Sequence, residues 1–549
     1  MKVYSVTLFL LLCIASPITL SFSIETDSID KALSKYSNDD SPGFAVAVTH
    51  KGKLVYAHYK GLANLEHSVP IDGQTLFNIA SISKSFTGYA IAKLENEGKV
   101  DAELSIRRYI PELSKHYESI KVKHLLHHTS GLWDSNSFLT IAGFNFNSRV
   151  PDSVVVINIL NSENAVNFDA GTMEQYSNTN YVLLSEIVSR VSQEGFSEYL
   201  KGNIFSSMRM DSPRIESPEA LNPNIAASYE RNGESIYPSS HVYSSQGSSS
   251  ILMSMDDFTK WMMSYDSDQS EIVKPHALAK LGGKLNTGTS VDYGYGLNLS
   301  LNGEMPYVGH SGRWNSYNSN YRYYTDENVG VAIFCNFACS VNGIRKVIEG
   351  SIFGESRKVS TLDREEPLPF KAENISQFEG DFKLQPGWIV SIHAGNDDIS
   401  GREFIYGENP IDVFATNNGA LYLPKYKASL KYGGSGNLVT FTDAFGEINA
   451  EVLDSSKYDP KNANNYVGVY YSDSLETSYR VFSLGDELYI NHSTNGRDKL
   501  TSINSKIFVG AGRFVAELHF EFGDNGKASG IVFHSLRLQG LRFRRMTVQ

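Results

Sequence analysis

Ser81 and Lys84 lie three residues apart, at the start of a segment whose apolar spacing predicts a helix from Ser81 to Gly98. One helical turn brings both side chains to the same face. A serine hydroxyl is a weak nucleophile, and a lysine kept neutral by burial and by positive neighbours can accept its proton. The helix start also offers a positive dipole and free N–H groups where an oxyanion would form. The pair therefore indicates nucleophilic attack on a carbonyl group.

Two later motifs could complete such a site. Tyr176-x-Asn178 lies in a loop that leads into an apolar helix, and His310-x-Gly312 lies at the expected start of a strand. Each motif alone is a weak signal, because an earlier set in the chain has the same spacings. The earlier set falls on the polar side of a helix, on a helix end and in a hairpin turn, which are typical solvent-exposed positions. The later motifs are flanked by apolar residues, and this favours them as the site. The earlier set is Ser28–Lys31, Tyr36–Asn38 and His50–Gly52.

Taken in this order, the motifs of residues 24–353 resemble those of the serine β-lactamase and penicillin-binding protein superfamily. The similarity is greatest to its class C β-lactamase-like branch, which includes D-aminopeptidases, carboxypeptidases and esterases. It implies an α/β (α+β) catalytic domain with an antiparallel sheet and a helical lobe. Besides the three motifs, the resemblance rests on His128-Thr129-Ser130-Gly131-Leu132 and on Gly247 to Trp261 with its Asp257.

The resemblance implies catalytic roles for three side chains. Ser81 would attack the carbonyl carbon and become acylated, and Lys84 would accept or relay its proton. Tyr176, whose free pKa is about 10, would be held near Ser81 as a phenolate or a proton shuttle. Which of these groups is the general base differs between accounts of the superfamily.

The resemblance also implies substrate-binding groups. Asn178 would hydrogen-bond the substrate amide and the lysine. Gly312 would belong to the substrate-binding groups, and His310 would bind the substrate or tune Tyr176. His310 stands where many relatives have a lysine, so it brings less fixed charge. The backbone N–H groups of Ser81 and Arg313 would form the oxyanion hole. Relatives often have a small residue at position 313, and here the arginine could narrow the site, supply a cation for a substrate carboxylate, or point away from the cleft.

These motifs must be positioned by a sheet built from both ends of residues 24–353, with helices between them. The expected helices are Asp27–Ser37, Ser81–Gly98, Asn180–Glu194 and Met255–Tyr265, and the expected strands are Phe44–Thr49, Leu54–Tyr59, Tyr293–Leu301, Ser319–Tyr324 and Val329–Phe337.

The composition changes after Phe353. Residues 354–373 are rich in charge and contain proline, which is typical of an exposed linker. From residue 374 onward, short alternating strands are separated by Gly, Asn and Asp. We expect an all-β part made of two barrel-like units, 374–456 and 463–549, with one larger β-domain as the alternative. It resembles the lipocalin-like β-barrel extensions of some family members.

The first 23 residues differ from the rest. Lys2 precedes an apolar run from Val6 to Ile14 and then small residues, a layout typical of a secretory signal peptide. A membrane anchor is the alternative, but the apolar run is shorter than the ~20 residues that span a bilayer. The expected location is therefore secreted or periplasmic, with no stable membrane span after cleavage.

Composition excludes several partners. The chain has 549 residues and a formal charge of -12, which argues against nucleic acid because phosphate binding needs a basic face. No His or Cys spacing suggests zinc, and His124, His127 and His128 are interpreted as helix-packing residues, so no metal or cofactor is expected. Cys335 and Cys339 are interpreted as buried thiols on one strand, too far apart along it to bridge easily.

We therefore expect a secreted serine hydrolase that forms an acyl-enzyme on Ser81 and hydrolyses amide or ester bonds in D-residue peptides or small esters. The alternatives are a non-catalytic penicillin-recognising or scaffold protein, a true β-lactamase, and a transacylase. Intact Ser81, Lys84 and Tyr176 argue against a scaffold, and a β-lactamase needs a positioned water that the motifs do not guarantee. The sequence does not indicate an oligomeric state.

Overall fold

The structure of the protein is a computed structural model. It describes residues 25–144, 153–216, 224–233, 235–239, 245–301, 305–354, 378–394, 399–405, 408–416, 419–432, 439–443, 446–510 and 515–547. The expected signal peptide and residues 355–373 of the expected linker lie outside the described residues.

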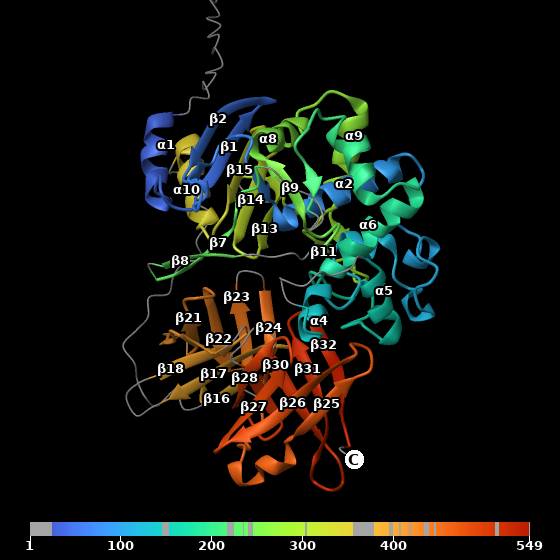
Figure 1. The fold of residues 1–549 in the computed structure, drawn as a ribbon, viewed down its shortest axis with the longest axis vertical. Coiled ribbons are helices and arrows are strands. Elements are labelled where there is room, and N and C mark those ends of the chain that lie inside the picture. The colour runs from blue at the N-terminus through green and yellow to red at the C-terminus, as the bar shows by residue number, and fades with distance from the viewer. Residues whose placement is uncertain are drawn as a thin grey trace, which may run out of the picture.

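A six-stranded antiparallel sheet forms the centre of the N-terminal part, in the order β12-β13-β14-β15-β1-β2 (Figure 1). Strands from the two ends of this part meet in the middle, where Phe44 of β1 pairs with Cys335 of β15. This confirms the expected α/β fold with an antiparallel sheet. The strands are β1 (Phe44–His50), β2 (Lys53–Lys60), β12 (Asn298–Ser300), β13 (Tyr307–Trp314), β14 (Tyr317–Tyr324) and β15 (Val329–Cys335).

Helices cover both faces of the sheet and build a separate lobe beside it (Figure 1). The expected helices are all present, with ends shifted by a few residues; the expected strand Tyr293–Leu301 is present only as β12. The helices are α1 (Thr26–Leu33), α2 (Ser83–Asn96), α3 (Val122–Leu126), α4 (Ser135–Ile141), α5 (Ser153–Ser162), α6 (Asn178–Ser192), α7 (Phe196–Leu200), α8 (Met255–Ser264), α9 (Ser270–Ala279) and α10 (Val341–Phe353), with a 3₁₀ turn, η2, at Ala80–Ile82.

Short strands connect these elements. They include β5, which leads into η2, and β9, which pairs with it. Their bounds are β3 (Leu62–Asn64), β4 (Val69–Pro70), β5 (Leu76–Asn78), β6 (Arg214–Ile215), β7 (Tyr229–Asn232), β8 (Ser235–Pro238), β9 (Ile251–Ser254), β10 (Gly283–Lys284) and β11 (Ser290–Val291).

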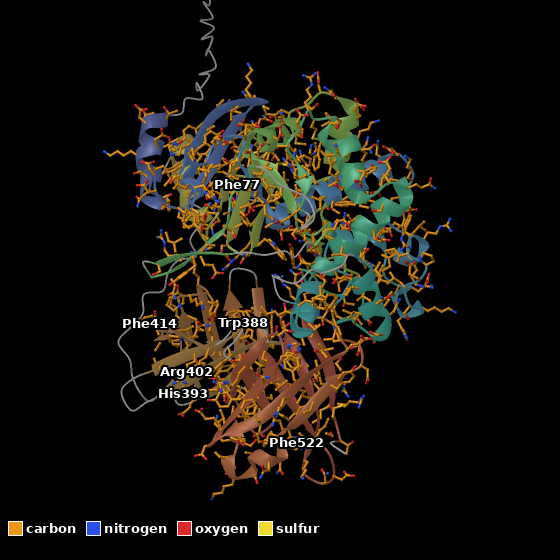
Figure 2. The ribbon with its side chains drawn as sticks, viewed as in Figure 1. Phe77, Trp388, His393, Arg402, Phe414 and Phe522 are labelled. Atoms are coloured by element: carbon orange, nitrogen blue, oxygen red, sulfur yellow. A yellow bond between two sulfur atoms is a disulfide. The ribbon has the colours of Figure 1, made fainter. Side chains whose placement is uncertain are left out.

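Strand β1 shows how alternation divides the core. Phe44, Val46 and Val48 pack in one apolar cluster with buried residues of α1 and α10. Ala45 and Ala47 belong to the cluster on the opposite face, which contains buried residues of α2 and α8. Successive side chains of a strand point to opposite faces, so β1 is buried on both sides and reads as a continuous apolar run. Figure 2 shows the packed interior, where Phe77 of β5 lies.

The first C-terminal unit is an open nine-stranded sheet, in the order β19-β18-β17-β16-β24-β23-β22-β21-β20. The sequence predicted a barrel-like all-β unit here, and the structure has an all-β unit whose sheet is open among the described strands. Its strands are β16 (Gly380–Gln385), β17 (Trp388–Ala394), β18 (Ile399–Phe404), β19 (Glu408–Ile411), β20 (Phe414–Ala415), β21 (Leu421–Leu423), β22 (Ala428–Tyr432), β23 (Val439–Asp443) and β24 (Gly446–Val452).

The second C-terminal unit is a closed eight-stranded barrel, in which β32 pairs back onto β25. Tyr, Phe and Leu side chains fill its interior. Its strands are β25 (Gly468–Ser472), β26 (Thr477–Leu484), β27 (Glu487–His492), β28 (Gly496–Ser502), β29 (Ile507–Gly510), β30 (Glu517–Phe522), β31 (Ala528–Ser535) and β32 (Leu538–Arg545).

The barrel packs directly against helix α4 of the catalytic part (Figure 1). The Tyr479 hydroxyl donates to the Ile141 carbonyl at 2.7 Å, and Asn495 Nδ2 donates to the Thr140 carbonyl at 2.8 Å. Buried side chains of α4 and of the barrel belong to one continuous apolar cluster. The barrel and the helical lobe therefore share a core.

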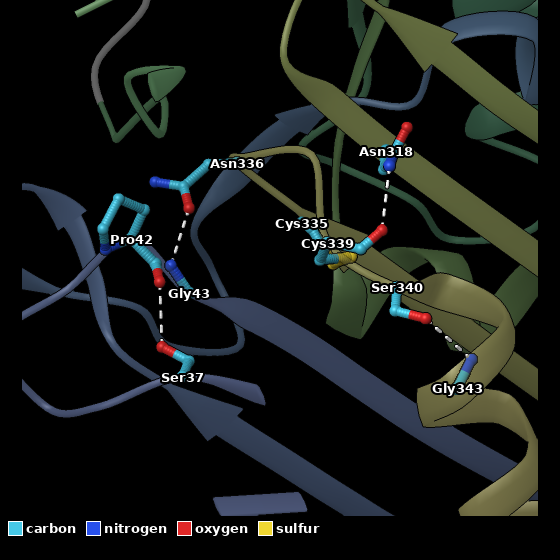
Figure 3. Close-up of a disulfide and its surroundings, with 9 residues drawn as sticks. All are labelled: Ser37, Pro42, Gly43, Asn318, Cys335, Asn336, Cys339, Ser340 and Gly343. Atoms are coloured by element: carbon cyan, nitrogen blue, oxygen red, sulfur yellow. Dashed lines mark hydrogen bonds between the residues drawn. A yellow bond between two sulfur atoms is a disulfide. The ribbon is translucent and has the colours of Figure 1, made fainter. Parts of the chain in front are cut away.

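The interpretation of the two cysteines as thiols was wrong, because Cys335 and Cys339 form a disulfide (Figure 3). Strand β15 ends at Cys335 and the chain then turns towards α10, so the two Cα atoms are 6.3 Å apart. An extended strand would have separated them by about 13 Å. The Asn318 amide of β14 donates to the Cys339 carbonyl at 3.0 Å, which ties the turn to the sheet.

Within the described ranges, no helix combines the length and the apolar character needed to cross a bilayer.

Candidate active site

Ser81 lies in η2, the 3₁₀ turn between strand β5 and helix α2. It therefore stands just before the α-helix, whereas the sequence predicted it at the helix start. Ala80 has φ +51°, a strained backbone conformation for a residue with a side chain, and its N–H donates to Asn78 Oδ1 at 2.8 Å. This turn carries the Ser81 hydroxyl to the edge of a cavity.

Lys84 is fully buried one turn after Ser81. Its Nζ lies 2.8 Å from Asn178 Oδ1, 2.7 Å from the Ser248 carbonyl and 3.2 Å from Ser81 Oγ. Burial lowers the pKa of Lys84 well below its usual value. A neutral amine has two N–H donors and one lone pair. Because the two carbonyl oxygens take the donors, the lone pair faces the Ser81 hydroxyl.

Asn178, the first residue of α6, is held by Asp134. Asp134 Oδ2 accepts from the Asn178 backbone N–H at 3.1 Å and from its Nδ2 at 2.9 Å, which turns Asn178 Oδ1 towards Lys84. Asp134 is only 1% exposed. The sequence analysis missed it; its signal was an aspartate directly before Ser135, because Asp134 caps the N-terminus of α4.

Tyr176 lies over Lys84, whose Nζ is 4.8 Å from the centre of the ring. Burial raises the pKa of Tyr176 above its usual value, while a hydrogen bond with Ser81 and the positive charge of Arg537 act in the opposite direction. The phenol is therefore neutral at pH 7. The His128 ring packs on Tyr176 with 4.3 Å between ring centres.

The two histidines of the site are also neutral. Burial lowers the pKa of His310 to about 3, and its Nε2 lies 2.9 Å from the Tyr293 hydroxyl. Burial also lowers the pKa of His128, whose Nδ1 accepts from the Ser177 N–H at 3.2 Å. The sequence analysis assigned His128 to helix packing, but it follows the end of α3 and contacts Tyr176 instead.

Gly312 allows strand β13 to approach the turn that carries Ser81. A Cβ atom at this position would lie 2.2 Å from Ser319 Oγ and 2.5 Å from the Ile79 carbonyl, so only glycine fits. The residues of β13 that pair with β12 are Tyr307–Gly309, so Gly312 and Arg313 lie beyond this pairing. The next residue, Arg313, is exposed and is among the residues that line the cavity.

The cavity at Ser81 has a volume of about 320 Å³. It brings together the three predicted motifs, whereas residues of the earlier, duplicate set are not among those that line it. Among the lining residues that the sequence analysis did not anticipate is Arg537, which comes from the barrel. The lining residues are Ser81, Asn136, Tyr176, Asn178, Ser249, Asn298, His310, Ser311, Arg313, Trp314 and Arg537.

Known proteins share this architecture. A family profile described as Beta-lactamase matches residues 29–341, more than half of the chain. Penicillin-binding protein 4* of Bacillus subtilis (strain 168) is 25% identical over 413 residues, which cover 70% of this chain and 89% of that protein. A D-aminopeptidase of Gluconobacter oxydans (strain 621H) is 25% identical over 318 residues, which cover 58% of this chain and 59% of that protein.

Among solved structures, the octameric penicillin-binding protein homologue from Pyrococcus abyssi overlaps with a TM-score of 0.52 at 23% identity, covering 77% of this chain and 98% of that one. The coverage extends beyond the catalytic part into the β-rich part. The chain belongs to the β-lactamase family, and so has the fold of a family of serine hydrolases.

Proposed function

We propose that the protein is a secreted serine hydrolase that forms an acyl-enzyme on Ser81 and cleaves amide or ester bonds. The observation that carries the proposal is the environment of Lys84. Its two carbonyl acceptors are fixed, its third neighbour is the Ser81 hydroxyl, and burial favours the neutral amine. A neutral amine within hydrogen-bonding distance of a serine is what a general base requires.

The reaction follows from these contacts. Ser81 Oγ attacks the carbonyl carbon and its proton passes to Lys84 Nζ. The backbone N–H groups of Ser81 and Arg313 stabilise the oxyanion. When the tetrahedral intermediate collapses, the leaving amine or alcohol takes the proton from Lys84, directly or through the neutral Tyr176 hydroxyl. A water molecule then attacks the acyl carbon and gives a proton to Lys84 Nζ. When this second tetrahedral intermediate collapses, the proton passes to Ser81 Oγ, the acyl–oxygen bond breaks and the carboxylic acid leaves.

The remaining groups would hold the substrate. Asn178 would offer its amide to the substrate while it positions Lys84. Gly312 would let β13 lie along the substrate, and His310 would contact it as a neutral ring. D-residue peptides and small esters are the proposed substrates, and similarity to a D-aminopeptidase and to a penicillin-binding protein supports them.

The domain organisation and location are part of the proposal. Residues 1–23 would be the signal peptide for export, residues 24–353 the hydrolase domain and residues 354–373 a linker. The units 374–456 and 463–549 would follow as two separate β units.

Replacing Ser81 with alanine should lower hydrolysis of an activated ester by at least about 10³-fold, because the acylated oxygen is lost. Ser28→Ala is the matched control, since Ser28 has the same spacing to a lysine but is exposed on α1. Intact-mass measurement after incubation with a fluorophosphonate should show one adduct on the wild type and none on Ser81→Ala. A wild type without an adduct would instead support the non-catalytic alternative.

A further inference from the structure

The turn between β31 and β32 of the barrel reaches the active site. Its Arg537 lines the same cavity as Ser81. Three hydrogen bonds fix the turn to the segments that carry the catalytic groups: the Asp134 N–H to the Arg537 carbonyl at 3.0 Å, Gln175 Nε2 to the Leu536 carbonyl at 2.8 Å, and the Gln539 N–H to Asn167 Oδ1 at 2.9 Å.

The open sheet supports this turn from behind. A Cβ atom on Gly387, in the turn between β16 and β17, would lie 2.6 Å from Ser535 Cα, so the two backbones touch. The Gly387 N–H donates to the buried Glu517 carboxylate of β30 at 2.7 Å. The position of Arg537 is therefore set by packed elements on both sides.

Among the residues that the structure describes, the N–H donors of the Arg537 guanidinium are not all used in hydrogen bonds. Its Cζ lies 4.7 Å from the centre of the Tyr176 ring, and Nη1 lies 3.8 Å from Asp134 Oδ2. That distance exceeds the roughly 2.7–2.9 Å of a charge-assisted hydrogen bond, and Asp134 Oδ2 already accepts two hydrogen bonds from Asn178. The Arg537 side chain is 41% exposed. Within the described part of the chain no closer ion pair or hydrogen bond engages its guanidinium, so N–H donors remain for a ligand.

The charged residues that line the cavity are both arginines, Arg313 of β13 and Arg537 of the barrel, and no Asp or Glu is among its described lining residues. The nearby Asp134 carboxylate is buried, lies 3.8 Å from Arg537 Nη1 and already accepts two hydrogen bonds from Asn178. Guanidinium groups bind carboxylates through paired N–H donors, so a cavity lined by arginines favours an anionic group on the ligand.

We propose that Arg537 is a specificity-determining residue that selects acyl substrates bearing a carboxylate group. The barrel is then part of the active site, since its Arg537 adds a second cation to the lining of the cavity. This inference rests on the proposed hydrolase activity. It names the substrate class as peptides or esters with a free carboxylate, as opposed to substrates recognised by a free amine.

The test uses the full-length protein and two depsipeptide esters that differ in one group of the leaving alcohol, a carboxylate or a carboxamide. Arg537→Gln should reduce the kcat/KM preference for the carboxylate ester by about 10- to 100-fold, mainly through KM, because a charged hydrogen bond is lost. Arg537→Lys should retain part of the preference. Arg542→Gln is the control, since Arg542 is a 72% exposed side chain on β32, the strand that follows the turn.

An equal loss on both esters in Arg537→Gln, or no loss, would overturn the inference while leaving the hydrolase intact. A wild type that cleaves neither ester and gains no fluorophosphonate adduct would overturn both proposals together. If Arg537→Gln does not fold, the inference is tested on the wild type alone, through its preference between the two esters. Its preference for the carboxylate ester should exceed about tenfold at low salt and decrease as the ionic strength rises, and the absence of that preference would refute the inference.

Discussion

Two fully buried ionisable groups, Lys84 in the active site and Glu517 at the junction of the two β units, respond to burial in opposite ways. Lys84 contacts only neutral oxygens, of Ser81, Asn178 and Ser248, and its pKa falls well below the usual value. Asp134, the carboxylate of the site, is separated from Lys84 by the Asn178 amide.

Glu517 has cationic partners and keeps its charge. Its carboxylate pairs with Lys383 Nζ at 2.7 Å, contacts the His519 ring and accepts from the Gly387 N–H. Burial alone would raise its pKa, but hydrogen bonds with His519 and Lys383 and their charges lower it to about 2. Burial makes a charge costly, and the partners decide whether it survives. The neutral partners of Lys84 favour an uncharged amine that can act as a base, whereas the charged partners of Glu517 keep it as a carboxylate that links the two β units.

Replacing Lys84 with methionine should have the largest effect. We expect kcat/KM for an activated ester to fall by about 10³-fold or more, because the general base is lost. The free energy of unfolding should change by less than about 2 kcal/mol, since removal of a buried amine offsets the two carbonyls left without a donor.

Lys93→Met is the matched control, because Lys93 lies on the same helix but is partly exposed in a pair with Glu97. If Lys84→Met lost activity because the protein no longer folded, Lys84 would be a structural residue. The contrast between Lys84 and Glu517 would then not hold.

Replacing Glu517 with alanine should show the reverse pattern. Unfolding by urea should reveal a loss of about 3 kcal/mol, because Lys383 and His519 lose their buried partner. The exposed pair of Glu487 with Lys499 provides the control, and Glu487→Ala should leave the urea midpoint nearly unchanged. Equal costs at the two positions would show that burial does not strengthen the Glu517 pairing.

The smallest effect is a difference in pH dependence. Unfolded Lys84 holds its proton up to about its ordinary pKa of 10.5 and folded Lys84 releases it at lower pH, so the wild type should gain stability relative to Lys84→Met as the pH rises towards 10.5. The stability that Glu517 adds is present above its ordinary pKa of 4.5 and should be lost as the pH falls towards 2, a slope that Glu517→Gln lacks. Urea unfolding measured across this pH range would contradict the expectation if the free energy of unfolding of each variant changed with pH in the same way as that of the wild type.

The sequence was informative where local pattern decides structure. Apolar runs located β1 and β15, helical spacing located α2 and α8, and the three motifs converge on one cavity. The same reasoning failed where a strand ended unexpectedly. Cys335 and Cys339 were placed on one straight strand, but β15 stops at Cys335 and the turn brings the two together.

Groups that enter the site from distant segments were not predictable. Asp134 gives only the signal of a helix cap, and Arg537 is one arginine among several in the tail. Their contacts depend on how α4 packs against the barrel, which no periodicity in the sequence records. The sequence predicted barrel-like all-β units but not which of them closes, because closure depends on pairing between the first and last strands of a sheet, here β19 and β20.

The closure of the barrel also sets an order of events in time. Strand β32 is the last strand of the barrel and completes it by pairing with β25, the first. Chains are synthesised from the N-terminus and fold as they emerge, so Ser81, Lys84 and Tyr176 are made long before the β31–β32 turn. A growing chain thus acquires its nucleophile and base first and its Arg537 last. Selectivity is the final property that the new molecule gains.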